Sequence, residues 1–104
     1  MNVTPTVEIS REEINKTEGA ILLEFGTSWC EYCRSAQDLS ASALANYPDI
    51  KHIKIEDGKG RALGRSFSVK LWPTLIFMKN GIEVKRLIRH FASEDIALGL
   101  NLIV

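Results

Sequence analysis

Residues 20–33 read AILLEFGTSWCEYC, and this stretch decides the fold. Its first six residues form a short and nearly continuous apolar run, which is typical of a central strand buried on both faces. A helical pattern follows and places apolar side chains on one stripe, at Ala36, Leu39, Ala43, Leu44 and Tyr47. The stretch therefore predicts a buried strand that turns directly into an amphipathic helix, with Cys30 and Cys33 at the junction.

The N-terminal flank carries the signals of a helix start. Ser10 can cap a helix, and Glu13 three residues later completes a capping box. A short strand over residues 7–9 is expected to feed this helix, which should end near Gly19.

The C-terminal flank continues the alternation of strands and helices. Pro48 ends the long helix, because a proline has no N–H for the helical hydrogen bonds. The remaining predicted elements are, in order, a strand over Ile50–Ile55, a loop and short helix over residues 57–67, a strand over Thr74–Met78, an Asn80-Gly81 hairpin turn, a return strand over Ile82–Ile88 and a helix capped by Ser93. This order predicts one α/β domain over residues 1–104, with a mixed central β-sheet sandwiched by α-helices.

Composition and charge exclude several classes of protein. The 104 residues are 45% hydrophobic and 25% charged, as in an ordinary globular domain. Thirteen basic and thirteen acidic groups give zero net charge, so no nucleic-acid partner is expected. No apolar run approaches the roughly 20 residues that cross a bilayer, so no membrane partner is expected either. Residues 1–9 lack the basic and apolar pattern of an export signal, which favours a cytoplasmic location.

The charges are unevenly distributed along the chain. Residues 1–50 carry a net charge of −5 and residues 51–104 a net charge of +5. The two halves either form complementary parts of one surface, or place a basic rim beside a binding site that favours acidic partners. The candidate rim residues are Arg61, Arg65, Lys70 and Arg89.

The position of the two cysteines predicts redox chemistry. A helix N-terminus stabilises a thiolate through its free N–H groups, which favours Cys30 as a nucleophile. Cys33 lies one turn further on the same face, close enough to attack a mixed disulfide formed at Cys30. Helical residues at this spacing have Cβ atoms about 5–6 Å apart, whereas a relaxed disulfide needs about 3.5–4.5 Å. The pair is therefore suited to opening and closing rather than to stabilising the fold.

Other uses of the cysteine pair fit its position and spacing less well. Two unreactive buried cysteines are a poor match for a strand–helix junction. A zinc site needs four ligands, and His52 and His90 lack the spacing to supply the other two, so no metal is predicted. The alternative function is a protein-docking module whose dithiol is idle or binds an iron–sulfur cluster shared between two chains.

Two motifs carry a resemblance to a known family. WCEYC at residues 29–33 follows the predicted buried strand, and WPT at residues 72–74 opens the strand TLIFM. Together they resemble the thioredoxin family over nearly the whole chain. The resemblance implies the thioredoxin fold, with Cys30 as attacking thiol and Cys33 as the resolving thiol that closes a Cys30–Cys33 disulfide.

The same resemblance implies a substrate groove and a set of partners. Pro73 would be a cis proline facing the cysteines, the backbone of Trp72 would pair with the substrate chain, and Trp29 would frame the groove. The expected function is a thiol–disulfide oxidoreductase that reduces protein disulfides. It would be a monomer without a cofactor, re-reduced by a reductase protein or by glutathione. A role as oxidant or isomerase fits less well with a cytoplasmic location.

Glu24 interrupts the apolar strand, and a charged group there is costly unless it is paired or protonated. It is either an edge-exposed glutamate or a buried acid that relays a proton to or from Cys33. The resembled family has an aspartate at this position and a neighbouring lysine, which corresponds to Lys54. Lys54 is equally well explained as a solvated lysine on a strand.

The chain also departs from the family pattern around the cysteines. Glu31 and Tyr32 stand where thioredoxins usually have glycine and proline, and the charge of Glu31 opposes formation of the Cys30 thiolate. Arg89 and His90 replace a glycine-containing loop beside the active site. These differences predict a bulkier and more positive groove, with Glu31, Tyr32 and Arg89 among the substrate-binding residues, and hence a narrower set of partners.

Overall fold

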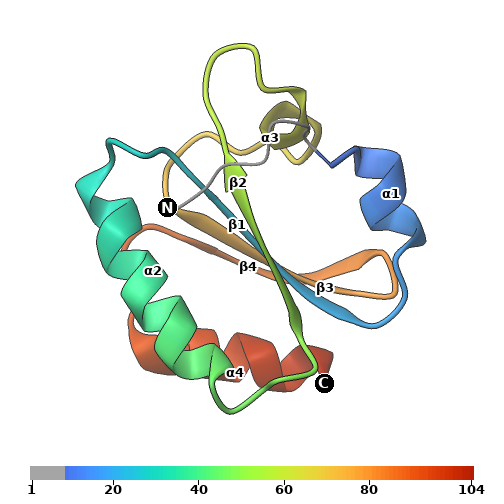
Figure 1. Ribbon diagram of the computed structural model, residues 1–104. Helices are drawn as coiled ribbons and strands as arrows, with labels where there is room; N and C mark the ends of the chain where they lie inside the picture. The colour runs from blue at the N-terminus through green and yellow to red at the C-terminus, as the bar shows by residue number, and fades with distance from the viewer. Residues whose placement is uncertain (1–8) are drawn as a thin grey trace.

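The computed structural model describes residues 9–104 (Figure 1). The elements, in chain order, are α1 (Arg11–Lys16), β1 (Ala20–Gly26), α2 (Glu31–Leu44), β2 (Lys51–Glu56), α3 (Ala62–Ser66), β3 (Thr74–Lys79), β4 (Ile82–Ile88) and α4 (Ser93–Ile103). Apart from the first strand, this is the predicted order. The strand expected over residues 7–9 reaches into residues that lie outside the described part of the chain, and Ile9 itself has no regular structure.

One mixed sheet forms the centre of the molecule, in the strand order β2-β1-β3-β4. β1 runs parallel to β2 and antiparallel to β3, and β3 and β4 form the predicted hairpin. Every residue from Ile21 to Gly26 is buried, as the apolar run predicts for a central strand covered on both faces. Because β1 is central, the segment that follows it emerges at the middle of one sheet edge, where loops from both sides can reach it.

Helices cover both faces of the sheet (Figure 1). On one face, Leu22 and Phe77 pack with Leu100 of α4 and with apolar residues of α2. On the other face, Leu23 and Ile76 pack with side chains of α1 and α3. The mixed sheet sandwiched by helices is therefore confirmed. No helix within residues 9–104 combines the length and apolar character needed to cross a bilayer.

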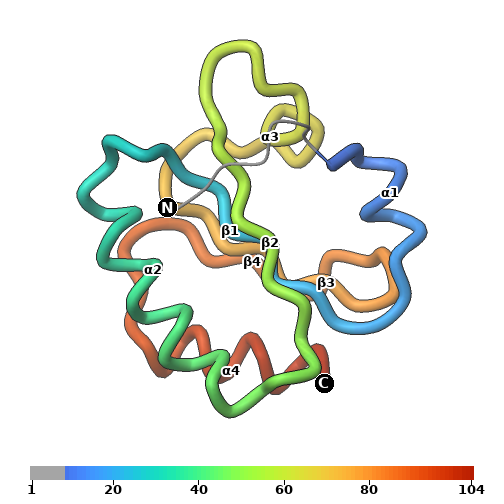
Figure 2. The backbone as a smooth tube through the Cα atoms, viewed as in Figure 1, coloured from blue at the N-terminus to red at the C-terminus, as the bar shows by residue number. Residues whose placement is uncertain are grey.

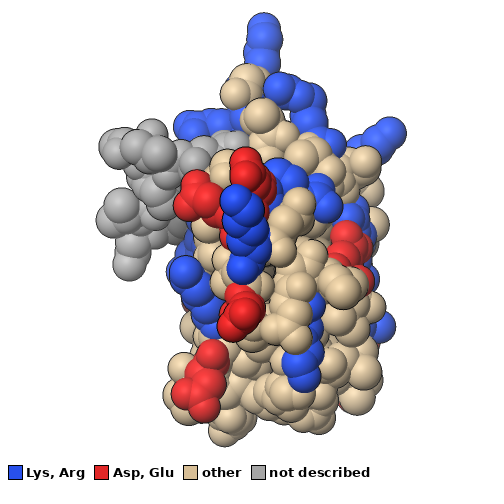
Figure 3. All heavy atoms as spheres, turned by 90° about the vertical axis from the view of Figure 1, so that its right-hand side faces the viewer, with Lys and Arg blue, Asp and Glu red and all other residues tan. Residues whose placement is uncertain are grey.

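Local signals fixed most of the element boundaries. Ser10 caps α1 and exchanges both bonds of the capping box with Glu13. Asn80 and Gly81 both have positive φ, at 51° and 78°, as the predicted Asn-Gly hairpin turn requires. Acidic and basic side chains intermingle on the face that carries α1, with basic ones gathered toward the end that holds α3 (Figure 3).

Three expected boundaries were wrong. α1 ends at Lys16 rather than near Gly19. α2 ends at Leu44 rather than at Pro48, because the N–H groups of Asn46 and Tyr47 donate to the carbonyls three residues earlier, in a tighter turn. Ser93 does not cap α4 but is its first residue. Ala92 is the cap, and its N–H donates to the carboxylate of Asp95 at 2.8 Å.

The folded chain brings two distant segments side by side. The turn between β1 and α2 lies beside the segment that leads into β3 (Figure 2). The rings of Trp29 and Trp72, one from each segment, meet edge to face with centroids 5.6 Å apart. Both sequence motifs therefore lie at the same end of the sheet.

We expect Gly99→Ala in α4 to destabilise the protein by about 1–3 kcal/mol. A Cβ at this position would lie 2.5 Å from Cζ of Phe77, so the helix must move off the sheet, although alanine is the better helix former. Denaturant unfolding would measure the loss. The neighbouring Leu98→Ala is the control, because Leu98 is 61% exposed and should change stability by less than about 0.5 kcal/mol. Unchanged stability of Gly99→Ala would contradict this packing.

Candidate active site

The two cysteines occupy the first turn of α2. Cys30 is the N-cap residue, and its Sγ accepts the backbone N–H of Cys33 at 3.2 Å. Both residues are free thiols, with 7% of Cys30 and 2% of Cys33 exposed. Both cysteines are therefore buried, and Cys30 is slightly the more accessible of the two.

Cys33 is buried by close approach of the helix to β1. A Cβ on Gly26 would lie 2.8 Å from the Cys33 sulfur, so glycine at this position lets the sulfur pack directly on the strand. Burial raises the pKa of the Cys33 thiol to about 12, and hydrogen bonding with the Cys30 side chain and the negative charges of Cys30 and Glu24 act in the same direction. The thiol is consequently protonated at neutral pH.

The opposite wall of the site comes from the segment before β3. The Trp72–Pro73 peptide bond is cis, and Pro73 is buried. The indole N–H of Trp72 donates to Asp57 at 2.9 Å, and the Nε–H of Arg89 donates to the Trp72 carbonyl at 2.8 Å. These two bonds fix both the ring and the backbone of Trp72. Asp57 was not predicted from the sequence, because no local pattern links it to a tryptophan 15 residues away.

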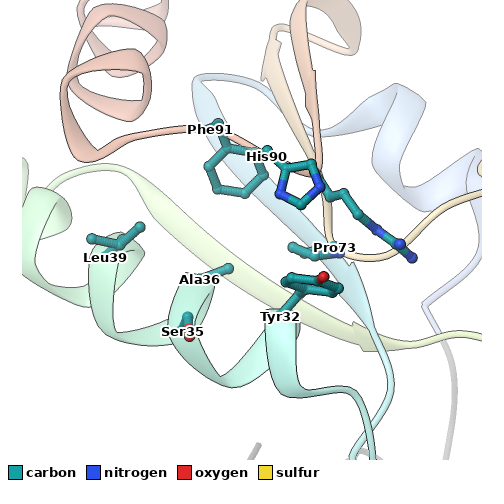
Figure 4. A pocket seen from close by; sticks show the side chains of 8 residues that line it. Tyr32, Ser35, Ala36, Leu39, Pro73, His90 and Phe91 are labelled. Carbon is teal, nitrogen blue, oxygen red and sulfur yellow. The ribbon is translucent and has the colours of Figure 1, made fainter.

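A groove lies between α2 and this opposite wall (Figure 4). It is lined by Tyr32, Ser35, Ala36, Leu39, Pro73, Arg89, His90 and Phe91. Two groove residues contact the ring of Tyr32. The Arg89 guanidinium lies 5.0 Å from the centroid of this ring, and the His90 ring packs against it edge to face with centroids 5.2 Å apart. Of the four candidate rim residues, only Arg89 lines this groove.

The remaining predicted contact residues differ in exposure. Trp29 is 68% exposed and Tyr32 is 52% exposed, so two large apolar rings face solvent beside the cysteines. Glu31 lies in the first turn of α2 with an exposed side chain. Exposed aromatic rings next to a reactive group are typical of a docking surface.

Glu24 is buried rather than edge-exposed, with 2% of its surface accessible. Its Oε1 lies 2.7 Å from Nε2 of His52 on β2, and its Oε2 has no hydrogen-bond partner. Lys54 lies directly opposite Glu24 in the strand register, yet no ion pair joins the two among the described residues. Lys54 is thus the strand neighbour of this acid that the family resemblance implies, but the residue that bonds to the carboxylate is His52.

From the sequence, His52 is considered as a zinc ligand and is excluded by its spacing from His90. It lies on a strand, and its side chain is only 18% exposed. The signal that could have found it is the parallel register of β1 and β2, which cannot be read from one sequence. Within residues 9–104 no three His, Cys, Asp or Glu side chains are grouped as metal ligands would be.

Comparisons with known proteins all find similarity between this chain and thioredoxins. The sequence model of the Thioredoxin family matches residues 3–101. A thioredoxin H3 of Arabidopsis thaliana is 30% identical over 99 residues, covering 92% of this chain and 83% of that protein. A thioredoxin H5 of Oryza sativa subsp. japonica is 34% identical over 77 residues, which are 74% of this chain but only 57% of that protein's length.

Solved structures agree with the sequence comparisons. Thioredoxin 2 from Pseudomonas aeruginosa PAO1, in its reduced form, is 41% identical and matches with a TM-score of 0.84. The match covers 98% of this chain and 95% of that one. The expected thioredoxin fold is therefore confirmed.

We expect the reduced protein to lose stability as the pH rises above 9.0, the ordinary thiol pKa. Between pH 9.0 and about 12 the folded chain keeps a proton on Cys33 that the unfolded chain has lost, so unfolding releases that proton and becomes easier as pH rises. Urea unfolding of the reduced protein on both sides of pH 9.0 would measure this loss.

Cys33→Ala is the control for that experiment, because it lacks the titrating thiol while keeping every other group that titrates at high pH. The unfolding midpoint of the natural sequence should fall more steeply with pH than that of the variant. Equal slopes would mean that Cys33 is not the source of the pH dependence.

Proposed function

The chain belongs to the thioredoxin family, and from this premise we propose that it reduces disulfide bonds of partner proteins through the Cys30/Cys33 dithiol. The observation that carries the proposal is the unequal pair of thiols in one helical turn. Cys30 caps the helix N-terminus and is 7% exposed, whereas Cys33 is 2% exposed and has a raised thiol pKa. Such a pair suits an attack by the Cys30 sulfur on a substrate disulfide, followed by resolution of the mixed disulfide by Cys33.

The reaction consists of two exchanges. The Cys30 thiolate attacks one sulfur of the substrate disulfide, and the other substrate sulfur leaves as a thiolate. Cys33 then loses its proton and attacks the Cys30 sulfur, which forms the Cys30–Cys33 disulfide and releases the second substrate sulfur. Two electrons pass from the dithiol to the substrate, and protons from Cys33 and the medium complete the substrate thiols.

The second exchange needs a base. Burial is the largest cause of the raised pKa of the Cys33 thiol and persists in the mixed disulfide, so the unaided attack of this protonated thiol would be slow. Glu24 is the candidate base, because its buried carboxylate acts electrostatically on Cys33 and keeps one oxygen without a partner. In this role Glu24 accepts the Cys33 proton as the mixed disulfide is resolved.

Substrate chains dock across the end of the sheet. Trp29 and Tyr32 offer apolar contact area, and Trp72 and Pro73 form the facing wall. The groove beside them has a volume of about 130 Å³, which suits one substrate side chain and is smaller than the roughly 300–1,000 Å³ of small-molecule sites. Arg89 gives this groove a positive charge, which favours substrates with an acidic side chain near the disulfide.

The oxidised protein would be re-reduced by a reductase protein or by glutathione. We place the cycle in the cytoplasm, where reduced thiols predominate, and we expect a monomer to carry it out without a resident cofactor. The cysteine pair would then be the only redox centre that the reaction needs.

Cys33→Ser tests this function directly. The serine cannot resolve the mixed disulfide, so substrate proteins should stay attached to Cys30 through a bond that thiol reagents release. Mass spectrometry of the captured species, before and after reduction, would measure it. Cys30→Ser is the matched control and should capture far less, because the buried thiol cannot reach a substrate. A docking module with an idle dithiol, or one that binds a cluster, would capture nothing in either variant.

Arg89→Gln should reduce kcat/KM about three- to tenfold for a peptide disulfide that carries an acidic residue, and should change it little for a neutral peptide of the same length. Glutamine keeps an N–H group that can bond to the Trp72 carbonyl but removes the charge. Arg86→Gln is the control, because Arg86 pairs with Glu83 on β4 and does not line the groove. Equal losses on both peptides would show that Arg89 acts only by holding Trp72.

A further inference from the structure

The pair formed by Glu24 and His52 connects the interior of the site with the surface. The carboxylate of Glu24 is 3% exposed and the imidazole of His52 is 18% exposed, and their nearest atoms lie 2.7 Å apart. Glu24 cannot exchange a proton with water by itself, because its free oxygen is fully enclosed. His52 is the one hydrogen-bond partner of this carboxylate among the described residues.

Glu24 lies on the face of β1 against which the Cys33 sulfur packs. Glu24 and Gly26 lie two residues apart on β1, so they share one face of the sheet. The Cys33 sulfur packs on that same face at Gly26, and the charge of Glu24 helps to hold the Cys33 proton in place. Cys33, Glu24 and His52 therefore follow one another from the buried thiol to the edge of the sheet.

No other described side chain around Glu24 and His52 is bonded to the Glu24 carboxylate and could pass a proton between it and water. Lys54 shares the face of β2 with His52 and is half-buried, but it makes no ion pair with Glu24. On β3 the residue opposite Glu24 is the apolar Leu75. From α2, the sheet-facing polar groups are Cys33 itself and the uncharged Ser40, which is fully buried.

We propose that His52 is a positioning residue that releases a proton to solvent when Glu24 takes up the proton of Cys33 during resolution of the mixed disulfide. This inference rests on the proposed function. In this role His52, on the neighbouring strand β2, lets the enclosed carboxyl group of Glu24 exchange protons with water. No property of Cys30, and no contact with substrate, is involved.

The proton balance of the step is simple. The proposed step starts from a pair that holds a single proton between Nε2 of His52 and Oε1 of Glu24, which lie 2.7 Å apart, and a second proton on the other ring nitrogen of His52. The Cys33 S–H bond breaks, its proton moves to the free oxygen of Glu24, and the Cys33 sulfur forms the bond to Cys30 while the substrate sulfur leaves with the electron pair. His52, which has lost its counter-charge, releases a proton from its other ring nitrogen to water. One proton enters the pair and one leaves it, so the pair stays neutral, and re-reduction of the disulfide reverses the steps.

A single-turnover reaction separates the two exchanges. Mixing the reduced protein with a chromogenic aromatic disulfide, such as dithiobis-nitrobenzoate, releases one coloured thiol when Cys30 attacks and a second when Cys33 resolves the mixed disulfide. In His52→Gln the first phase should keep its rate, and the second should slow by about tenfold or more. Glutamine keeps a hydrogen-bond donor for Glu24 but cannot release a proton.

Chemical rescue distinguishes proton transfer from a structural role. Imidazole added to His52→Ala should restore the rate of the second phase in proportion to its concentration, and should leave the first phase unchanged. Lys51→Gln is the matched control, because Lys51 lies on the same strand with an exposed side chain and should alter neither phase.

Three results would be decisive against the proposal. An unchanged second phase in His52→Gln would overturn it, as would equal slowing of both phases or an absence of imidazole rescue in a variant that unfolds at the normal urea concentration. Absence of the first phase in the natural sequence would instead contradict the proposed function. The two failures are therefore distinguishable in one experiment.

Discussion

The burial of the Cys33 sulfur between α2 and the end of β1 is the constraint on which the rest of the site depends. Because Gly26 has no side chain, the helix approaches the strand until the sulfur fills the space that a Cβ would occupy. The position of Cys30 follows, since a helix that starts here must place its N-cap one turn earlier and nearer the surface. One turn of helix thus gives two identical thiols different surroundings and different chemistry.

The wall opposite the cysteines is rigid for a separate reason. Trp72 lies in a short segment without regular structure, and such segments are usually mobile. Here Asp57 accepts a hydrogen bond from the Trp72 indole, and Arg89 donates one to the Trp72 carbonyl. These side-chain bonds take the place of the backbone hydrogen bonds that a strand would make. A substrate chain therefore meets a surface whose shape is set before it binds, which lowers the entropic cost of docking.

The features that the sequence predicted correctly are mostly ones that depend on neighbours along the chain. The capping box of Ser10 and Glu13, the Asn80-Gly81 turn and the strand–helix junction at Cys30 are all of this kind. The cap of α4 was misplaced by one residue because Asp95 stabilises the helix start from within, whatever the identity of the cap residue. His52 and Asp57 were missed because their partners lie 28 and 15 residues away, and only the strand register and loop packing bring them together.

The choice of His52 over Lys54 as the partner of Glu24 has an electrostatic consequence. A carboxylate buried beside a buried thiol is destabilising unless a cation matches it, and the effective penalty is several kcal/mol. A lysine would match it permanently, because an ammonium group keeps its proton at neutral pH. That permanent charge would be left without a counter-ion whenever Glu24 took up a proton. An imidazole can give up its charge at that moment, so the interior is neutral both before and after the proton leaves Cys33. His52 thus lets Glu24 accept the Cys33 proton when the dithiol is oxidised and return it when the disulfide is reduced. Neither step leaves an uncompensated charge inside the protein.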